Sequence, residues 1–210
     1  ALGHGKIKIH FIGVWDTVGS LGVPVSRINR LLKKFRDFQD FHDTSLNTNI
    51  RHAYHAVAID ERRGPFPATL WIKGNESRVE TAQQVWFCGV HSNVGGGYPD
   101  AGLENCALHW MTAKAGSHGL DLNTGYLAGF EPNPGGELYD SRKGMYLTMN
   151  PKIRDVDWTE YAGAAIHESV LQRLQKVDKY RPDNLLSGLK VHPVVDTDGN
   201  IVRPPGPYTD

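Results

Sequence analysis

Two runs of apolar residues in this chain each end abruptly at an ionisable side chain. Residues 7–15 precede Asp16, and residues 84–90 precede His91. Both runs are rich in β-branched and aromatic residues, so they predict buried β-strands. Glycines at 95–97 follow the second run and allow the backbone to turn sharply, with no side chains to obstruct a substrate.

The rest of the pattern alternates between helical and extended segments. Apolar residues recur at helical spacing over four segments, 26–38, 48–59, 103–115 and 161–177. A short apolar run over 68–72 predicts a further strand, and residues 125–136 are loop-like. Prolines and glycines dominate from residue 181 onward, which predicts an irregular tail. The alternation of strands and helices favours an α/β layered fold with a mostly parallel sheet.

The ends of the two strands carry the candidate chemistry. In open α/β sheets, the reactive groups lie beyond the carboxyl ends of the strands. An Asp followed later by a His, each at a strand end, matches the second part of the Ser…Asp…His order of α/β-hydrolases. Taken alone, the His91 motif is equally compatible with a core strand that has a polar residue at its end.

Two longer motifs resemble a known family. Residues 11–19 (Phe-Ile-Gly-Val-Trp-Asp-Thr-Val-Gly) and 87–98 (Phe-Cys-Gly-Val-His-Ser-Asn-Val-Gly-Gly-Gly-Tyr) resemble the Asp and His motifs of the DUF2235 α/β-hydrolases. That family includes phospholipase effectors of the bacterial type VI secretion system. Further similar stretches are 55–63 with 67–71, 103–120, and 166–170 with 180–182, so the resemblance extends to about Leu186. The family often has an acidic residue where this chain has Asn93.

The resemblance implies the C-terminal part of an α/β-hydrolase-like fold over residues 1–186, followed by an irregular Pro/Gly-rich tail over 187–210. It implies a carboxylic ester hydrolase, with phospholipids as candidate substrates, in which Asp16 and His91 belong to a Ser-His-Asp triad. The loop after His91 supplies candidate substrate-binding residues, namely Ser92, Asn93, Gly95 and Gly96.

The nucleophile of such a triad is missing from the motifs. The family's serine lies in a Gly-x-Ser-x-Gly elbow before the Asp motif, between a strand and a helix. Ser20 follows the Asp strand, and Ser117 lies at the end of a predicted helix, so neither has this context. We therefore expect the serine upstream of this chain and the isolated chain to be inactive. The alternative is a non-catalytic binding or scaffold module with degenerate hydrolase architecture.

The amino-acid composition of the chain limits the kinds of binding partner that it can have. The 210 residues carry no formal net charge, which argues against electrostatic binding to nucleic acid. No apolar stretch approaches the roughly 20 residues of a membrane span, and residues 1–15 lack the features of a signal peptide. We expect a soluble protein, cytoplasmic in the producing cell or secreted without a signal peptide. Expected partners are an ester or lipid substrate, the missing N-terminal segment and a membrane surface, for which 26–38 is the best amphipathic candidate.

We expect neither a metal nor a cofactor. His52 and His55 lie three apart on a predicted helix and form a candidate metal pair with Asp60 or Glu61, but no third histidine has suitable spacing. No Lys-Ser/Thr pair follows the glycines at 95–97, so they do not form a P-loop. The charged run at 60–63 is typical of a solvated turn or a structural salt bridge. Cys88 lies inside an apolar run, which predicts a buried thiol rather than a nucleophile.

Overall fold

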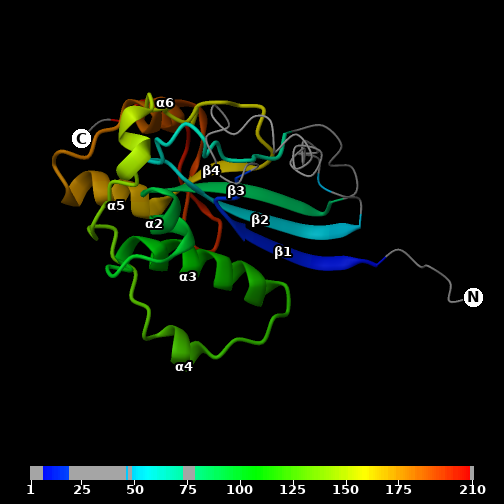
Figure 1. Ribbon diagram of the computed structural model, residues 1–210. Helices are drawn as coiled ribbons and strands as arrows, with labels where there is room; N and C mark the ends of the chain where they lie inside the picture. Colours follow the sequence, from blue (N-terminus) through cyan, green and yellow to red (C-terminus); the bar gives the residue numbers. More distant parts are fainter. Residues whose placement is uncertain (1–6, 19–45, 47–48, 73–78, 209–210) are drawn as a thin grey trace, which may run out of the picture.

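A computed structural model describes residues 7–18, 46, 49–72 and 79–208, and a mostly parallel six-stranded sheet lies at its centre (Figure 1). The strands follow one another across the sheet in chain order: β1 (Ile9–Trp15), β2 (Ile50–Ala58), β3 (Thr81–Phe87), β4 (Ala164–His167), β5 (Val194–Val195) and β6 (Ile201–Arg203). Neighbours pair in parallel as far as β5, and β6 is antiparallel to it. The predicted α/β fold class is confirmed.

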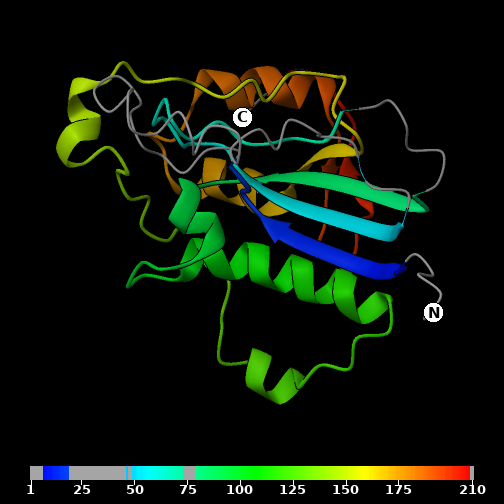
Figure 2. The same cartoon turned by 45° about the vertical axis from the view of Figure 1, so that its right-hand side comes forward.

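Helices flank both faces of the sheet (Figures 1 and 2). The helical elements are α2 (His91–Gly95), α3 (Gly102–Ser117), α4 (Thr124–Leu127), the 3-10 helix η2 (Gly144–Thr148), α5 (Glu168–Lys176) and α6 (Asp183–Val191). On one face Trp110 of α3 packs with Phe87 of the sheet. On the other face Leu174 of α5 and Leu189 of α6 pack with Trp86. Alternate residues of one strand therefore enter two separate cores.

The best-defined sequence patterns are confirmed. The apolar runs at 7–15 and 84–90 correspond to β1 and β3, and the helix expected over 103–115 is α3. The apolar face of α3 is buried as its spacing predicts, with Leu103, Cys106, Ala107, Trp110 and Met111 all inside. Long apolar segments with one clear period leave little ambiguity between helix and strand.

The helix predicted over 48–59 is wrong, because this segment forms β2. Ile50, Ala53, Tyr54 and Val57 have helical spacing, but in the structure β2 is paired on both edges and nearly every residue is buried. A strand that is buried on both faces has no need to alternate apolar and polar residues. His52 and His55 consequently point to opposite faces of the sheet and cannot form the candidate metal pair.

The C-terminal third is more regular than its sequence predicts. The helix expected over 161–177 begins only at Glu168, because residues 164–167 form β4. His167 caps this helix, since its side chain accepts a hydrogen bond from the Ser169 backbone N–H. The tail expected to be irregular over 187–210 is partly regular, because it contains the end of α6 and both β5 and β6. The expected domain boundary after Leu186 falls within α6.

Two weaker expectations meet different outcomes. The strand expected over 68–72 is reduced to isolated bridges, of Ala68 with Val18 and of Ile72 with Tyr161. Residues 125–136 are mostly loop, but α4 begins this stretch, with the Asn123 side chain accepting a hydrogen bond from the Tyr126 N–H. The amphipathic helix expected over 26–38 lies outside the described residues.

Candidate active site

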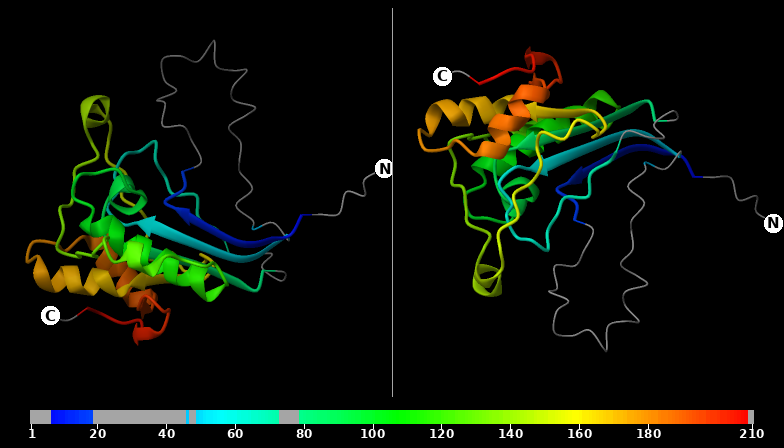
Figure 3. Two further views of the ribbon diagram at one scale, coloured as in Figure 1. Left: turned by 90° about the horizontal axis from the view of Figure 1, so that it is seen from below. Right: turned by 90° about the horizontal axis from the view of Figure 1, so that it is seen from above.

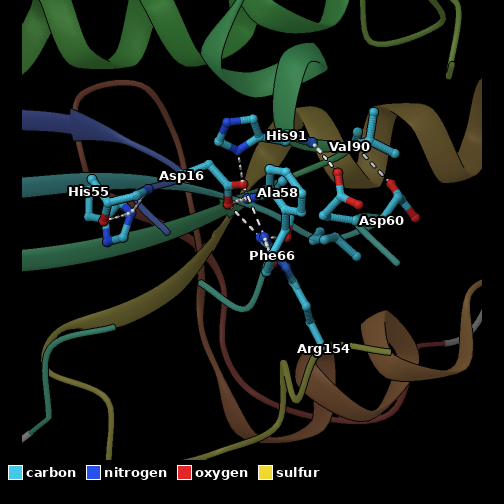
Figure 4. A network of polar contacts seen from close by, with 12 residues as sticks. Asp16, His55, Ala58, Asp60, Phe66, Val90, His91 and Arg154 are labelled. Atoms are coloured by element: carbon cyan, nitrogen blue, oxygen red, sulfur yellow. Dashed lines mark hydrogen bonds and ion pairs between the residues drawn. The ribbon is translucent and has the colours of Figure 1, made fainter. Parts of the chain in front are cut away.

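Asp16 and His91 meet at the carboxyl edge of the sheet, as the strand pattern predicts (Figure 4). Asp16 directly follows β1, and its N–H donates to the Ala56 carbonyl at 2.7 Å, which prolongs the ladder with β2. His91 lies four residues beyond β3 and begins α2. Gly89 makes the intervening turn at φ +121, where a Cβ would lie 2.4 Å from that of Asn93.

The two side chains form a direct hydrogen bond. His91 Nδ1 lies 2.7 Å from Asp16 Oδ2. A carboxylate only accepts, so Nδ1 carries the proton and donates, and Nε2 of the neutral ring keeps its lone pair. The Asp16 side chain is fully buried, whereas 31% of the His91 side chain is exposed. The ring therefore presents a basic nitrogen away from a fixed carboxylate, as a general base requires.

Arg154 holds Asp16 from the opposite side (Figure 4). Its Nη1 donates to Asp16 Oδ1, and its Nη2 donates to Oδ2 at 3.0 Å. The same guanidinium also donates to the backbone carbonyls of Ala58 at 2.7 Å and Phe66 at 3.0 Å. With the Ala58 N–H donating to Oδ1 at 2.9 Å, the carboxylate accepts four hydrogen bonds and its orientation is fixed.

These contacts keep Asp16 ionised inside the protein. Burial alone would raise the pKa of its carboxyl group. The hydrogen bond from His91 and the charge of Arg154 outweigh burial and hold that pKa well below its usual range. Asp16 is thus a permanent anion at neutral pH, available to stabilise an imidazolium at His91.

His55 supports the turn that follows Asp16. The Thr17 N–H donates to His55 Nε2 at 3.1 Å, so Nε2 is unprotonated and Nδ1 carries the hydrogen toward Gln84 Oε1. Burial lowers the pKa of His55 to about 4, so the ring is neutral at neutral pH. A neutral imidazole serves here as a fixed acceptor for a backbone group.

The two carboxylates of the charged run at 60–63 are buried, whereas Arg62 is exposed, and these carboxylates organise the His91 loop. Glu61 Oε2 accepts from the His91 N–H at 3.2 Å and from Arg63 Nη2 at 2.9 Å, and Ser141 Oγ donates to Oε1. Asp60 Oδ2 accepts from the Gly89 N–H at 2.7 Å and from the Tyr180 hydroxyl at 2.8 Å. Of the two interpretations of this run, the structural salt bridge is confirmed by the Glu61–Arg63 ion pair, and only Arg62 is exposed as a solvated turn predicts.

The four loop candidates occupy different environments. Asn93 is buried, and its side-chain amide bonds the backbone at Val90, Tyr139 and Glu137. This geometry makes Asn93 a brace of the loop. Ser92 and Gly96 are half-buried and Gly95 is exposed, so all three are at least partly accessible to solvent.

Ser117 lies far from the Asp16–His91 pair. It is exposed at the end of α3, where its hydroxyl donates to the Lys114 carbonyl at 2.8 Å. The next residue, His118, contacts His10 at the beginning of β1, whereas Asp16 follows the end of that strand. Ser117 is therefore at the wrong end of the sheet for attack assisted by His91. Ser20 lies outside the described residues.

An aromatic wall extends from His91 toward a projecting segment. The Phe66 ring lies 5.9 Å from the His91 ring and 5.8 Å from that of Tyr146 in η2, centroid to centroid. The Arg63 guanidinium stacks 3.8 Å from the Phe66 centroid. Figure 3 shows the η2 segment standing out from the body of the protein on this side. A cavity of about 120 Å³ beside Phe66 and Arg154 is smaller than typical ligand pockets.

Sequence reasoning predicted that Asp16 and His91 lie together but missed most of the residues that hold them in place. Arg154 has no local motif, since it approaches Asp16 across 138 residues of sequence. His55 was considered as a candidate metal ligand, and Glu61 both as a metal ligand and as part of the charged run at 60–63. A signal was present in the run at 60–63, because buried charges directly after a buried strand need partners. Cys88 is buried with its thiol pKa raised by burial, as its place in an apolar run predicts.

The fold and this site together define a class of protein. A buried carboxylate bonded to an imidazole at the carboxyl edge of a mostly parallel sheet is typical of α/β hydrolases. The chain belongs to the family described as "T6SS, Phospholipase effector Tle1-like, catalytic domain", whose model matches residues 2–114, more than half of its length. This is the family formerly designated DUF2235, so the resemblance is confirmed over these residues. Membership indicates a lipid hydrolase that acts on phospholipids.

The match includes Asp16 and His91 but ends within α3. The similar stretches at 166–170 and 180–182 lie beyond it and remain a prediction. Comparison with curated proteins gives no match, and neither does comparison with solved structures. Among the described residues, no helix is long and apolar enough to cross a membrane.

Proposed function

We propose that this chain supplies the Asp and the His of a Ser-His-Asp triad in a phospholipase, namely Asp16 and His91. We also propose that the serine lies in a segment upstream of Ala1. The observation that carries the proposal is the 2.7 Å hydrogen bond from His91 Nδ1 to the buried Asp16, which leaves Nε2 as the base. Family membership supports the lipid substrate. The strand order supports the placement of the serine, because β1 is the edge strand of the described sheet and one of its sides lacks a partner strand there.

Each group has a defined task in this mechanism. The serine Oγ attacks the ester carbonyl carbon while His91 Nε2 takes its proton, and Asp16 stabilises the resulting imidazolium. The imidazolium returns the proton to the leaving alcohol as the acyl-enzyme forms. Water then attacks the acyl-enzyme with the same assistance and releases the fatty acid. Backbone N–H donors to the oxyanion contribute about 3–4 kcal/mol each to such reactions.

We also propose that η2 contacts the lipid surface that holds the substrate. Met145 and Leu147 are apolar yet 57% and 62% exposed, and Ile153 nearby is 57% exposed. Arg142, Lys143 and Lys152 flank them and favour an anionic surface. Phe66 connects this segment to His91, so lipid docked here would lie next to the proposed base.

The test uses the protein from its native source, with whatever precedes Ala1, and a fluorophosphonate probe that labels activated serines. We expect one adduct on an upstream serine, mapped by mass spectrometry, and labelling slowed at least about a hundredfold in His91→Ala, the loss typical for a general base. His109→Ala is the matched control, because His109 lies on α3 and its ring bonds the Phe130 carbonyl, away from Asp16 and His91.

Other outcomes are equally informative. An adduct on Ser20 or Ser117 would show that the nucleophile lies within this chain and contradict an upstream serine. A folded protein that takes up no probe would contradict the triad and favour the alternative, a non-catalytic binding or scaffold module. Equal labelling of His91→Ala and the unchanged protein would remove His91 from the mechanism.

A further inference from the structure

Three histidines gather at the end of the sheet opposite the Asp16–His91 pair. His10 lies near the beginning of β1, His52 near the beginning of β2, and His118 directly after α3. One nitrogen from each ring lies within 4.8 Å of the other two. Figure 2 shows α3 ending beside the beginning of β1. The three rings thus come from three elements that are remote in sequence.

The fold itself produces this convergence. His10 precedes Phe11, the register partner of His52, and the ring centroids of His10 and His52 are 5.2 Å apart. The His118 ring stacks on that of His52 with centroids 3.7 Å apart, and the His118 carbonyl lies 3.1 Å from His10 Nε2. Since 108 residues separate His10 from His118, sequence spacing gives no sign of the cluster.

Each ring has one nitrogen in a hydrogen bond and one remaining. His52 Nδ1 lies 3.3 Å from Thr81 Oγ1, His118 Nε2 lies 2.8 Å from the Tyr54 hydroxyl, and His10 Nε2 donates to the His118 carbonyl. This is the usual arrangement of histidines that bind metals, whose second ring nitrogen is fixed by a hydrogen bond.

A nearby carboxylate completes the donor set. Glu80 Oε2 lies 3.8 Å from His52 Nε2, and Arg51 holds the other oxygen of that carboxylate at 2.6 Å. Three imidazoles and one carboxylate form a donor set that suits Zn²⁺.

We propose that His10, His52 and His118, with Glu80 as the fourth ligand, bind a divalent transition-metal ion of the zinc type. In tetrahedral coordination the ligand nitrogens would lie about 3.4 Å apart, so the rings must close in and His118 must turn out of its stack on His52. His118 precedes Gly119, whose φ of +91 marks the bend after α3. The ion would tie β1, β2 and α3 together, at a site independent of the hydrolytic groups.

The test is a titration of the metal-free chain with ZnCl₂ in competition with a chromophoric chelator. We expect one ion per chain. Loss of one ligand in His52→Gln or His118→Gln should weaken binding more than the roughly 10–100-fold that loss of an outer hydrogen-bond partner costs. Tyr54→Phe removes such a partner from His118 and should weaken binding within that range. His109→Gln, on α3 outside the cluster, should bind as the unchanged chain does.

Circular dichroism of each variant separates a lost ligand from a lost fold. The proposal is overturned if the folded chain binds no zinc, or if His52→Gln and His118→Gln bind it with unchanged affinity. An equal loss in His109→Gln would also overturn it, because binding would then not depend on this cluster. If a ligand variant does not fold, unchanged affinity in folded Tyr54→Phe decides against the site.

Discussion

Asp16 is a buried anion whose stability depends on one cation. The side chains of Asp16 and Arg154 are 0% and 6% exposed, so neither charge is solvated by bulk water. A buried ion pair contributes little net stability, since desolvation offsets much of its attraction. Removing only one partner is costly, because the remaining charge stays buried without compensation. Replacing Asp16 or Arg154 alone should therefore cost more stability than replacing both residues together.

Single and double substitutions at this pair should differ in a characteristic way. We expect Asp16→Asn to lose about 3–5 kcal/mol of unfolding free energy, because the Arg154 charge is left unpaired. The double variant Asp16→Asn/Arg154→Met should recover most of that loss, since no buried charge remains. His91→Ala should stay within about 1 kcal/mol of the unchanged protein, because its ring is partly exposed. Urea unfolding of the four proteins measures these differences.

A different result would change the interpretation of Arg154. If Asp16→Asn and the double variant were equally unstable, the arginine would not be acting as the counter-ion. Its hydrogen bonds to the Ala58 and Phe66 carbonyls would then be its main contribution.

At the scale of residues, the sequence predicts those site residues that directly follow the end of an apolar strand. Asp16 and His91 were found because each stops an apolar run at a sheet edge. Arg154 was not found, because a lone arginine far along the chain has no periodic or local signal. Only the tertiary fold brings Arg154 to Asp16. The same is true of His10, His52 and His118, which the fold brings together from distant parts of the sequence.

At the scale of elements, burial on both faces is what misled the prediction. β1 and β3 carry dense β-branched and aromatic runs, and α3 has one clear helical face, so all three were predicted correctly. β2 is buried on both faces, and among its buried residues Ile50, Ala53, Tyr54 and Val57 fall at helical spacing. β4 is only four residues long and is followed directly by α5. Its residues were therefore included in the helix predicted over 161–177.

The η2 segment gives a prediction at the same scale. We expect Met145→Glu/Leu147→Glu to reduce binding to anionic phospholipid vesicles at least about tenfold. The two changes remove apolar area and add negative charge next to the cations of this segment. Co-sedimentation with vesicles measures the binding.

Leu120→Glu is the matched control, because Leu120 is 57% exposed, as Met145 is, but lies just beyond α3 and away from η2. It should bind vesicles as the unchanged protein does. Equal binding by the η2 variant and the control would contradict a lipid-facing role for η2.

At the scale of the whole molecule, buried neutral histidines couple stability to pH. Burial lowers the pKa of His55 to about 4 and that of His167 to about 3. An unfolded histidine titrates near pH 6.5, so between that pH and the folded pKa the unfolded chain binds more protons. Stability contributed by these two groups is complete above pH 6.5 and declines as the pH falls.

We therefore expect the unfolding free energy to drop by about 2–4 kcal/mol between pH 7 and pH 5. Urea unfolding at several pH values measures the drop. Asp60 acts in the opposite direction, since burial raises its pKa. His55→Gln isolates one imidazole and should reduce the slope by about half. An unchanged slope in that variant would show that His55 does not titrate with folding.

The long reach of Arg154 has a consequence for biosynthesis. The ribosome makes Asp16 and, later, His91 well before it makes Arg154, which follows Asp16 by 138 residues. At typical synthesis rates the nascent chain carries the carboxylate for roughly 7–30 s before its counter-ion exists. The residues matched by the family model end before that point, at residue 114. A ribosome-bound chain synthesised as far as residue 114 contains both Asp16 and His91 and lacks the Arg154 side chain that fixes their geometry.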